Sequence, residues 1–158
     1  MTAGVEIRVN QATAAEIAAH LVRCDQAFVP RLSERVEIDD YARKIAERAE
    51  RFEGWSHGAL VGLVAAYCSD DEIGSAYITN VSVVPEYRHR GIASLLLAEC
   101  VDFAHRQQLG RISLDVDREN VPAVVLYEAK GFSVASVSGQ TIRMDLYTGE
   151  DVHMGNQS

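Results

Sequence analysis

The residues best suited to chemistry lie in a short turn between an apolar strand that stops at Pro85 and a predicted helix. Arg88, His89, Arg90 and Gly91 occupy this turn. The N-terminus of a helix exposes free N–H groups and the positive end of the helix dipole, which favour a phosphate. Gly91 lets backbone approach a ligand without a Cβ in the way, and the arginines add charge and donors. The turn therefore predicts an anion site for a diphosphate; the alternative is a solvated basic loop ahead of an ordinary helix.

The chain lacks the motifs of three other kinds of site. It has no G-x-x-x-x-G-K-[ST] sequence, which a P-loop requires. Too few glycines follow the strand for the dinucleotide fingerprint. His20 and Cys24 are four residues apart on one predicted helical face, a spacing that a metal can use. No third ligand follows at a supporting spacing, so we expect no metal.

Six segments read as strands, because apolar and β-branched residues alternate or run together in them. They are Val5–Val9, Ala59–Cys68, Ser75–Val84, Ile112–Val116, Phe132–Val137 and Gln140–Tyr147. The polar stretch Ser69–Gly74 would join the second and third of these as a hairpin. Pro85 then ends the third strand, because proline cannot donate to a strand ladder.

Four segments have the apolar spacing of helices that bury one face. They are Ala14–Cys24, a second from Asp39 with the apolar face Tyr41, Ile45, Ala49 and Phe52, a third from Gly91 to about Gln108, and Val121–Ala129. Thr13 and Asn120 are the predicted N-caps of the first and last. Phe28–Val36 is left as a loop and Gly54–Gly58 as a turn. This order predicts a three-layer α/β (α+β) fold with a mixed sheet.

Composition narrows the class of protein. The 158 residues suit one domain over residues 1–150, followed by a polar, flexible tail over 151–158. The net charge of −8 disfavours nucleic acid or an anionic membrane as the main partner. Three cysteines without a CxxC suit a reducing compartment. With no secretory signal visible, we expect a cytoplasmic protein.

Two motifs resemble those of a known family. The segment Arg88–Ala93, RHRGIA, matches the signature R/Q-x-x-G-x-G/A of the GNAT acyl-CoA N-acyltransferases, with Ala93 in place of the final glycine. Downstream, Asn120–Phe132 matches the family's N-x-x-A-x-x-L-Y-x-x-x-G-F. The resemblance covers about residues 60–147, and it implies a central, mostly antiparallel sheet of about six to seven strands flanked by helices.

The resemblance also implies a set of roles, with acetyl-CoA as acyl donor and no metal. The strand residues Val81, Ser82 and Val83 would hold the pantetheine arm. The pyrophosphate would lie on the amides of Arg88, His89, Arg90, Gly91, Ile92 and Ala93. Asn120 would contact the cofactor where neighbouring strands separate. Tyr127 would lie beside the thioester sulfur and protonate the departing thiolate, while Asp115 would be the base for an amine that attacks the thioester directly.

Several assignments stay open. Glu86, Glu72 and His57 are alternative bases, each more typical of a surface or turn residue. Phe28, Trp55 and Tyr41 are candidates for the acceptor pocket, and Cys68 and Cys100 are expected to be buried packing residues. The chain is expected to be an N-acetyltransferase acting on a primary amine: a small molecule, an amino sugar or a peptide N-terminus. The alternative is an acyl-CoA-binding sensor without turnover, and either protein could form a homodimer.

Overall fold

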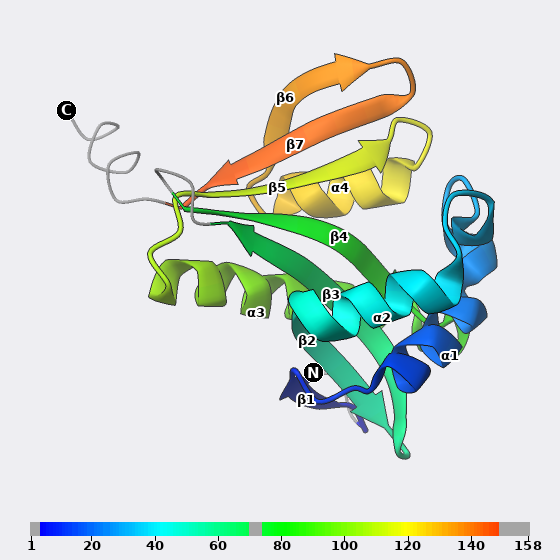
Figure 1. Cartoon of the computed structure of the whole chain (residues 1–158). Coiled ribbons are helices and arrows are strands. Elements are labelled where there is room, and N and C mark those ends of the chain that lie inside the picture. The colour runs from blue at the N-terminus through cyan, green and yellow to red at the C-terminus, as the bar shows by residue number, and fades with distance from the viewer. Residues whose placement is uncertain (1–3, 70–73, 149–158) are drawn as a thin grey trace.

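The computed structural model describes residues 4–69 and 74–148 and shows a seven-stranded sheet between two layers of helices (Figure 1). The strands are β1 (Glu6–Val9), β2 (Glu50–Ser56), β3 (Ala59–Ser69), β4 (Ser75–Val83), β5 (Arg111–Asp117), β6 (Ser133–Ser138) and β7 (Thr141–Tyr147). The helices are α1 (Ala14–Cys24), α2 (Ile38–Arg48), α3 (Ile92–Arg106) and α4 (Val121–Ala129), with short 3-10 turns η1 (Asp25–Ala27), η2 (Leu32–Glu34) and η3 (Pro85–Tyr87).

The strand order is β1-β2-β3-β4-β5-β7-β6. Every neighbouring pair is antiparallel except β4 and β5, which run parallel because α3 carries the chain back between them. The three-layer α/β fold with a mixed, mostly antiparallel sheet is thus confirmed. The predicted tail over 151–158 and the candidate Glu72 lie outside the described residues.

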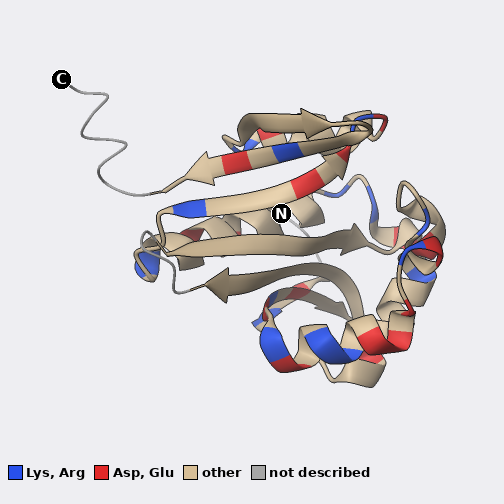
Figure 2. Cartoon of the chain, turned by 45° about the horizontal axis from the view of Figure 1, so that its top comes forward, with Lys and Arg blue, Asp and Glu red and all other residues tan. Residues whose placement is uncertain are grey.

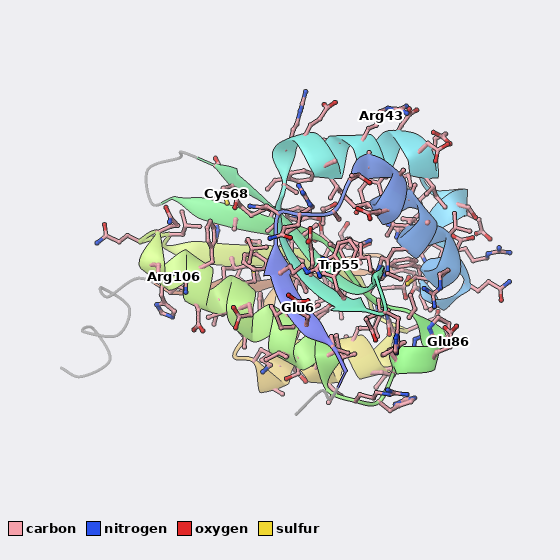
Figure 3. The ribbon with its side chains drawn as sticks, turned by 90° about the horizontal axis from the view of Figure 1, so that it is seen from below. Glu6, Arg43, Trp55, Cys68, Glu86 and Arg106 are labelled. Carbon is pink, nitrogen blue, oxygen red and sulfur yellow. The ribbon has the colours of Figure 1, made fainter. Side chains whose placement is uncertain are left out.

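The two faces of the sheet carry separate cores. Leu63 and Ala65 of β3 pack under α1 and α2, whereas Val64 and Ala66 point to the opposite face, where α3 and α4 lie. Seen edge-on in Figure 3, α1 and α2 lie on one side of the sheet and α3 and α4 on the other. Gly62 lets α3 approach closely, because a Cβ there would lie 2.8 Å from Cγ2 of Ile92.

The strand β2 corrects the predicted second helix. Phe52 and the Gly54 region are not helix and turn: α2 ends at Arg48, and Glu50–Ser56 pairs with both β1 and β3. The strand went unrecognised because two charged residues, Arg51 and Glu53, interrupt its apolar pattern. Both are buried, and the Nε of Arg51 lies 3.2 Å from Oε2 of Glu53.

The carboxylate of Glu53 explains how a charge is tolerated there. It accepts hydrogen bonds from the backbone N–H groups of Gln11 and Ala12 and from the indole Nε1 of Trp55, at 3.0–3.1 Å. Buried charges persist in proteins when they are paired and hydrogen-bonded in this way. These bonds tie the segment that leads into α1 to β2.

The predicted packing of the cysteines is half right. Cys100 on α3 is buried, as expected. Cys68 is exposed, which corrects the prediction, because burial along β3 ends before its last two residues. Figure 3 shows Cys68 at the far end of the hairpin from α1. Among the described residues, the helices are all too short or too polar to cross a membrane.

The most important irregularity for function lies where β4 parts from β5. The parallel pairing runs only from Ser75 opposite Arg111 to Ile78 opposite Leu114, although both strands continue. On the other side of β4, the register to β3 shifts so that Ala65 faces Asn80 and Ala66 faces Ile78, which makes Thr79 an extra, bulged residue. A bulge bends and twists its strand, so β4 and β5 open into a gap at their carboxyl ends.

Candidate active site

Helix α3 begins at this gap, and its N-terminus lacks the usual cap. The N-caps of the other three α-helices of the described chain, Thr13, Glu37 and Asn120, each accept a hydrogen bond from a first-turn N–H. Gly91, the N-cap of α3, has no side chain to do so, and no acidic residue follows in the first turn. The first N–H groups of α3 are therefore free to bind an anion.

Gly91 is also the residue that the backbone requires. Its φ of +78° lies in the left-handed region that side chains rarely adopt, and a Cβ there would meet open space. The neighbouring His89 has a φ of +63°. Two left-handed residues so close together bend the backbone tightly. The helix begins at Ile92, directly after Gly91, as predicted.

Side chains brace the turn from both ends. The Nε of Arg88 donates to the carbonyl of Val83 at 3.3 Å. Arg90 donates to the carbonyl of Glu86 and stacks 4.8 Å from the centre of the Tyr87 ring. The carboxylate of Glu86 pairs with Arg23 of α1 at 3.2 Å. This ion pair links helix α1 to the anion-binding turn.

A cavity of about 400 Å³ lies in front of α3. It brings together most residues predicted to bind the cofactor, which are Val81, Ser82, Val83, Arg88, His89, Gly91, Ile92, Ala93, Asn120 and Tyr127. Arg90 is the exception, because its side chain turns away to stack on Tyr87. Cys24, Ala27 and Phe28 close the cavity from the α1 side. An elongated ligand with an anionic end fits this arrangement.

A second cavity, of about 220 Å³, opens on the other side of β4. Its walls include Arg35, Asn80, Asp115 and Asp117. The two cavities share four lining residues, Phe28, Val81, Asn120 and Tyr127. The gap between β4 and β5 therefore joins a larger chamber with anion-binding amides to a smaller, more polar one.

Tyr127 stands at this junction, on α4. It is 8% exposed, and its ring packs edge-on against Phe132 with 6.0 Å between centroids. Burial raises the pKa of Tyr127 to about 12. The phenol is thus fully protonated at neutral pH and available as a proton donor.

Asp115 lies in the second cavity, but its surroundings argue against a base. Its carboxylate accepts hydrogen bonds from the phenol of Tyr77 at 2.8 Å and from the guanidinium of Arg143. These bonds, led by that of Arg143, hold the pKa of Asp115 below its ordinary value. Both oxygens of this carboxylate are therefore already engaged by donors that favour its charged form.

The other sequence candidates lie in different places. Phe28 lines both cavities, as expected for an acceptor-pocket residue. Trp55 is instead a core residue bonded to Glu53, and Tyr41 reaches the site only indirectly, through hydrogen bonds to Thr79. His57 sits in the turn between β2 and β3 with a φ of +50°.

Sequence reasoning missed one polar group, made by His20 on α1 with Ser82 and Asn80 on β4. His20 Nε2 lies 2.8 Å from the hydroxyl of Ser82, which lies 2.7 Å from Oδ1 of Asn80. His20 and Ser82 are 62 positions apart, so no local pattern could show their contact. In the described part of the chain no three His, Cys, Asp or Glu side chains gather as metal ligands, so the pair of His20 and Cys24 stays without a third.

Comparisons with known proteins identify the family of the chain. The acetyltransferase (GNAT) family matches residues 15–132. The [Ribosomal protein bS18]-alanine N-acetyltransferase of Escherichia coli K12 is 28% identical over 111 residues, 70% of each chain. The N-alpha-acetyltransferase RimI of Mycobacterium tuberculosis is 28% identical over 156 residues, covering 94% of this chain and 90% of its own.

Solved structures share the fold. The crystal structure of the ribosomal-protein-S18-alanine N-acetyltransferase from Escherichia coli superposes with a TM-score of 0.73 at 21% identity, over 92% of this chain and 94% of that one. The structure of yncA from Salmonella typhimurium, with its cofactor acetyl-CoA, gives 0.72 at 20% identity over 93% and 95%. The acyl donor is acetyl-CoA, whose diphosphate and long thiol arm suit the larger cavity. With an uncapped α3, a left-handed Gly91 and matching relatives, the chain belongs to the acetyltransferase (GNAT) family and is an N-acetyltransferase.

Proposed function

We propose that the protein acetylates the α-amine at the N-terminus of a peptide or protein. The observation that carries this proposal is the second cavity. It meets the larger cavity, where the acyl donor would lie, at Phe28, Val81, Asn120 and Tyr127. Polar walls around a small volume suit an amine flanked by a peptide backbone. One relative is named an alanine N-acetyltransferase of a ribosomal protein and another an N-alpha-acetyltransferase, which supports a peptide or protein acceptor. Three free cysteines support a reducing compartment, the cytoplasm.

The residues around the junction would divide the work. The amides from Arg88 to Ala93 hold the diphosphate, and the backbone of Val81 and Val83 holds the thiol arm in the gap beside β4. The amine attacks from the second cavity, where Asp115 and Asp117 attract its ammonium form. Tyr127 protonates the departing thiolate. Asp115 acts through its charge and its bond to Tyr77, in place of the base that the sequence suggested.

The acceptor class is tested by measuring thiol release from acetyl-CoA with a matched panel of amines. The panel contains a short peptide with a free N-terminus, the same peptide with a blocked N-terminus and an internal lysine, and an amino sugar. We expect turnover with the first alone. Turnover confined to the amino sugar favours a small-molecule acceptor, as in the streptothricin acetyltransferase of Streptomyces lavendulae, which is 34% identical over 56 residues. Tight binding of acetyl-CoA without turnover on any amine favours the sensor instead.

A further inference from the structure

The buried group of His20, Ser82 and Asn80 links the two cavities. Ser82 lines the larger cavity, which we assign to the acyl donor, and Asn80 lines the second cavity, which we assign to the acceptor. His20, on α1, contacts Ser82. His20 is only 1% exposed. Figure 1 shows α1 beside the carboxyl end of β4, where this contact forms. A buried imidazole that is hydrogen-bonded, through a hydroxyl, to the walls of both cavities suggests a function.

The hydrogen-bond partners fix which nitrogen of His20 can titrate. Nδ1 lies 3.1 Å from the backbone carbonyl of Leu60 on β3, and a carbonyl can only accept. Nδ1 therefore carries a proton in both charge states of the ring. Nε2, which faces Ser82 at 2.8 Å, is the atom that gains or lacks one.

The hydroxyl of Ser82 has one proton and two acceptors within reach. When Nε2 is bare, the hydroxyl can donate to Nε2 and leave Oδ1 of Asn80 without this donor. When Nε2 is protonated, Nε2–H donates to the hydroxyl oxygen, and the hydroxyl donates to Asn80. Each contact of the group then has a donor and an acceptor. The arrangement is built to receive a proton at Nε2 by way of Ser82.

We propose that Ser82 and His20 form the relay that takes the proton from the acceptor amine, a proposal that rests on the N-acetyltransferase activity. The amine nitrogen forms a bond to the acetyl carbon as the carbon–sulfur bond breaks. The amine proton passes to the oxygen of Ser82, while the proton of Ser82 passes to Nε2 of His20. The thiolate takes a separate proton from Tyr127, so a neutral amine and the thioester give one amide, one thiol, a protonated His20 and a Tyr127 phenolate. Return of a proton from His20 to Tyr127 through solvent restores both groups.

The electrostatic surroundings keep His20 neutral, with Nε2 bare, before the reaction. Burial, more than any charge, lowers the pKa of His20 to about 4, so the ring is neutral at physiological pH. The hydrogen bond to Leu60 opposes this shift, and Arg23 on the same helix adds to it. On the facing elements, Arg88 and Glu86 act on Cys24, whose sulfur lies 3.7 Å from Nε2. The thiol itself is no competitor, because burial raises the pKa of Cys24 to about 11.

The sharpest test replaces His20 by Gln, whose amide can still hydrogen-bond to Ser82 but cannot take up a proton. With the peptide acceptor, we expect kcat to fall by roughly 10²-fold or more, the usual effect of losing an acid–base group. The KM for acetyl-CoA and the melting temperature should stay near their wild-type values. The kcat of the variant should rise continuously with pH, because hydroxide must then remove the proton of the acceptor amine.

Two further variants complete the test. Ser82→Ala leaves His20 in place but breaks the relay, so it should reproduce the loss in kcat and the changed pH profile, even if His20→Gln does not fold. Val22→Ala, on the exposed face of the same helix at 62% exposure, is the control and should keep full activity.

A wild-type kcat and pH profile in both relay variants would overturn the relay while leaving the acetyltransferase intact. So would a His20→Gln protein that recovers full kcat, because a hydrogen bond would then be all that His20 supplies. Absence of thiol release in the wild-type protein with every amine would instead overturn the activity on which the relay rests.

Discussion

Arg143 on β7 holds the carboxylate of Asp115 on β5 through two hydrogen bonds, Nε to Oδ1 at 2.7 Å and Nη2 to Oδ2 at 3.1 Å. The two residues are direct partners in the antiparallel register of these strands. Figure 2 shows acidic and basic positions on both of the neighbouring strands β5 and β7. The pairing accounts for the lowered pKa of Asp115.

The first prediction is that Asp115→Asn keeps most of the turnover. We expect kcat to fall by less than about tenfold, since removal of a true base costs roughly 10²–10⁴. The KM for the amine should rise, because one attracting charge is lost. Because pairing lowers the pKa of Asp115, its effect should be present at neutral pH and disappear only as the pH falls through that low pKa. A loss of 10²-fold or more in kcat at pH 7 would return Asp115 to the role of base.

The second prediction concerns Tyr127→Phe, which keeps the ring packed on Phe132 and removes the hydroxyl. Turnover should fall by roughly 10²–10⁴, while the affinity for acetyl-CoA changes little. Since the pKa of Tyr127 is raised to about 12, the wild-type enzyme should show no loss of activity from its ionisation below about pH 11. Steady-state kinetics across pH, with calorimetry for binding, measure both. A joint collapse of binding and melting temperature would mark Tyr127 as a packing residue only.

The third prediction is that Gly91→Asp abolishes the rise in melting temperature that CoA produces. Saturating ligand at 100 times its dissociation constant adds about 2.7 kcal/mol of stability. The variant places a carboxylate at the uncapped end of α3, where the diphosphate should lie. Gly139→Asp is the matched control: Gly139 also has a left-handed φ, +59°, and open space at its Cβ position, but it lies in the β6–β7 turn. A normal CoA shift in Gly91→Asp would place the anion elsewhere.

The fourth prediction concerns stability. Glu53→Ala removes a carboxylate that accepts hydrogen bonds from four groups and leaves Arg51 buried without its charged partner. Breaking one side of a buried pair typically costs about 3–5 kcal/mol, and urea unfolding should show a loss of this size. Glu6→Gln breaks an exposed pair with Arg8 of the same strand, β1, and should leave the midpoint unchanged. Equal midpoints for the Glu53 variant and the wild type would contradict the account of β2.

The sequence was most informative where function constrains local chemistry. The anion turn follows from Pro85, Gly91 and the helix after them, and the structure places them as expected. The strand β2 was misread because the spacing of Ile45, Ala49 and Phe52 continues a helical rhythm by coincidence. Its true state depends on the partners of Arg51 and Glu53, which come from distant segments.

The parts of the site made by contacts across elements were beyond local patterns. Asp115 has the residue type and position of a base, and only the register of β5 on β7 reveals Arg143 beside it. In the same way, the spacing of His20 and Cys24 is compatible with a metal site. Only the packing of α1 against β3 and β4 shows that His20 is hydrogen-bonded to Leu60 and Ser82. Residue type indicates which side chains are able to do chemistry. Their neighbours in the folded protein decide which role each of them takes.

The four-residue parallel ladder between Ser75–Ile78 and Arg111–Leu114 has a consequence for hydrogen exchange. Beyond Ile78, the edge of β4 that faces the gap has no neighbouring strand, so its amides should exchange with solvent quickly for a central strand. A thiol arm lying along Val81 and Val83 would cover that edge as an added strand does. Bound donor should therefore slow exchange in the carboxyl half of β4, and leave the outer strand β6 as it was.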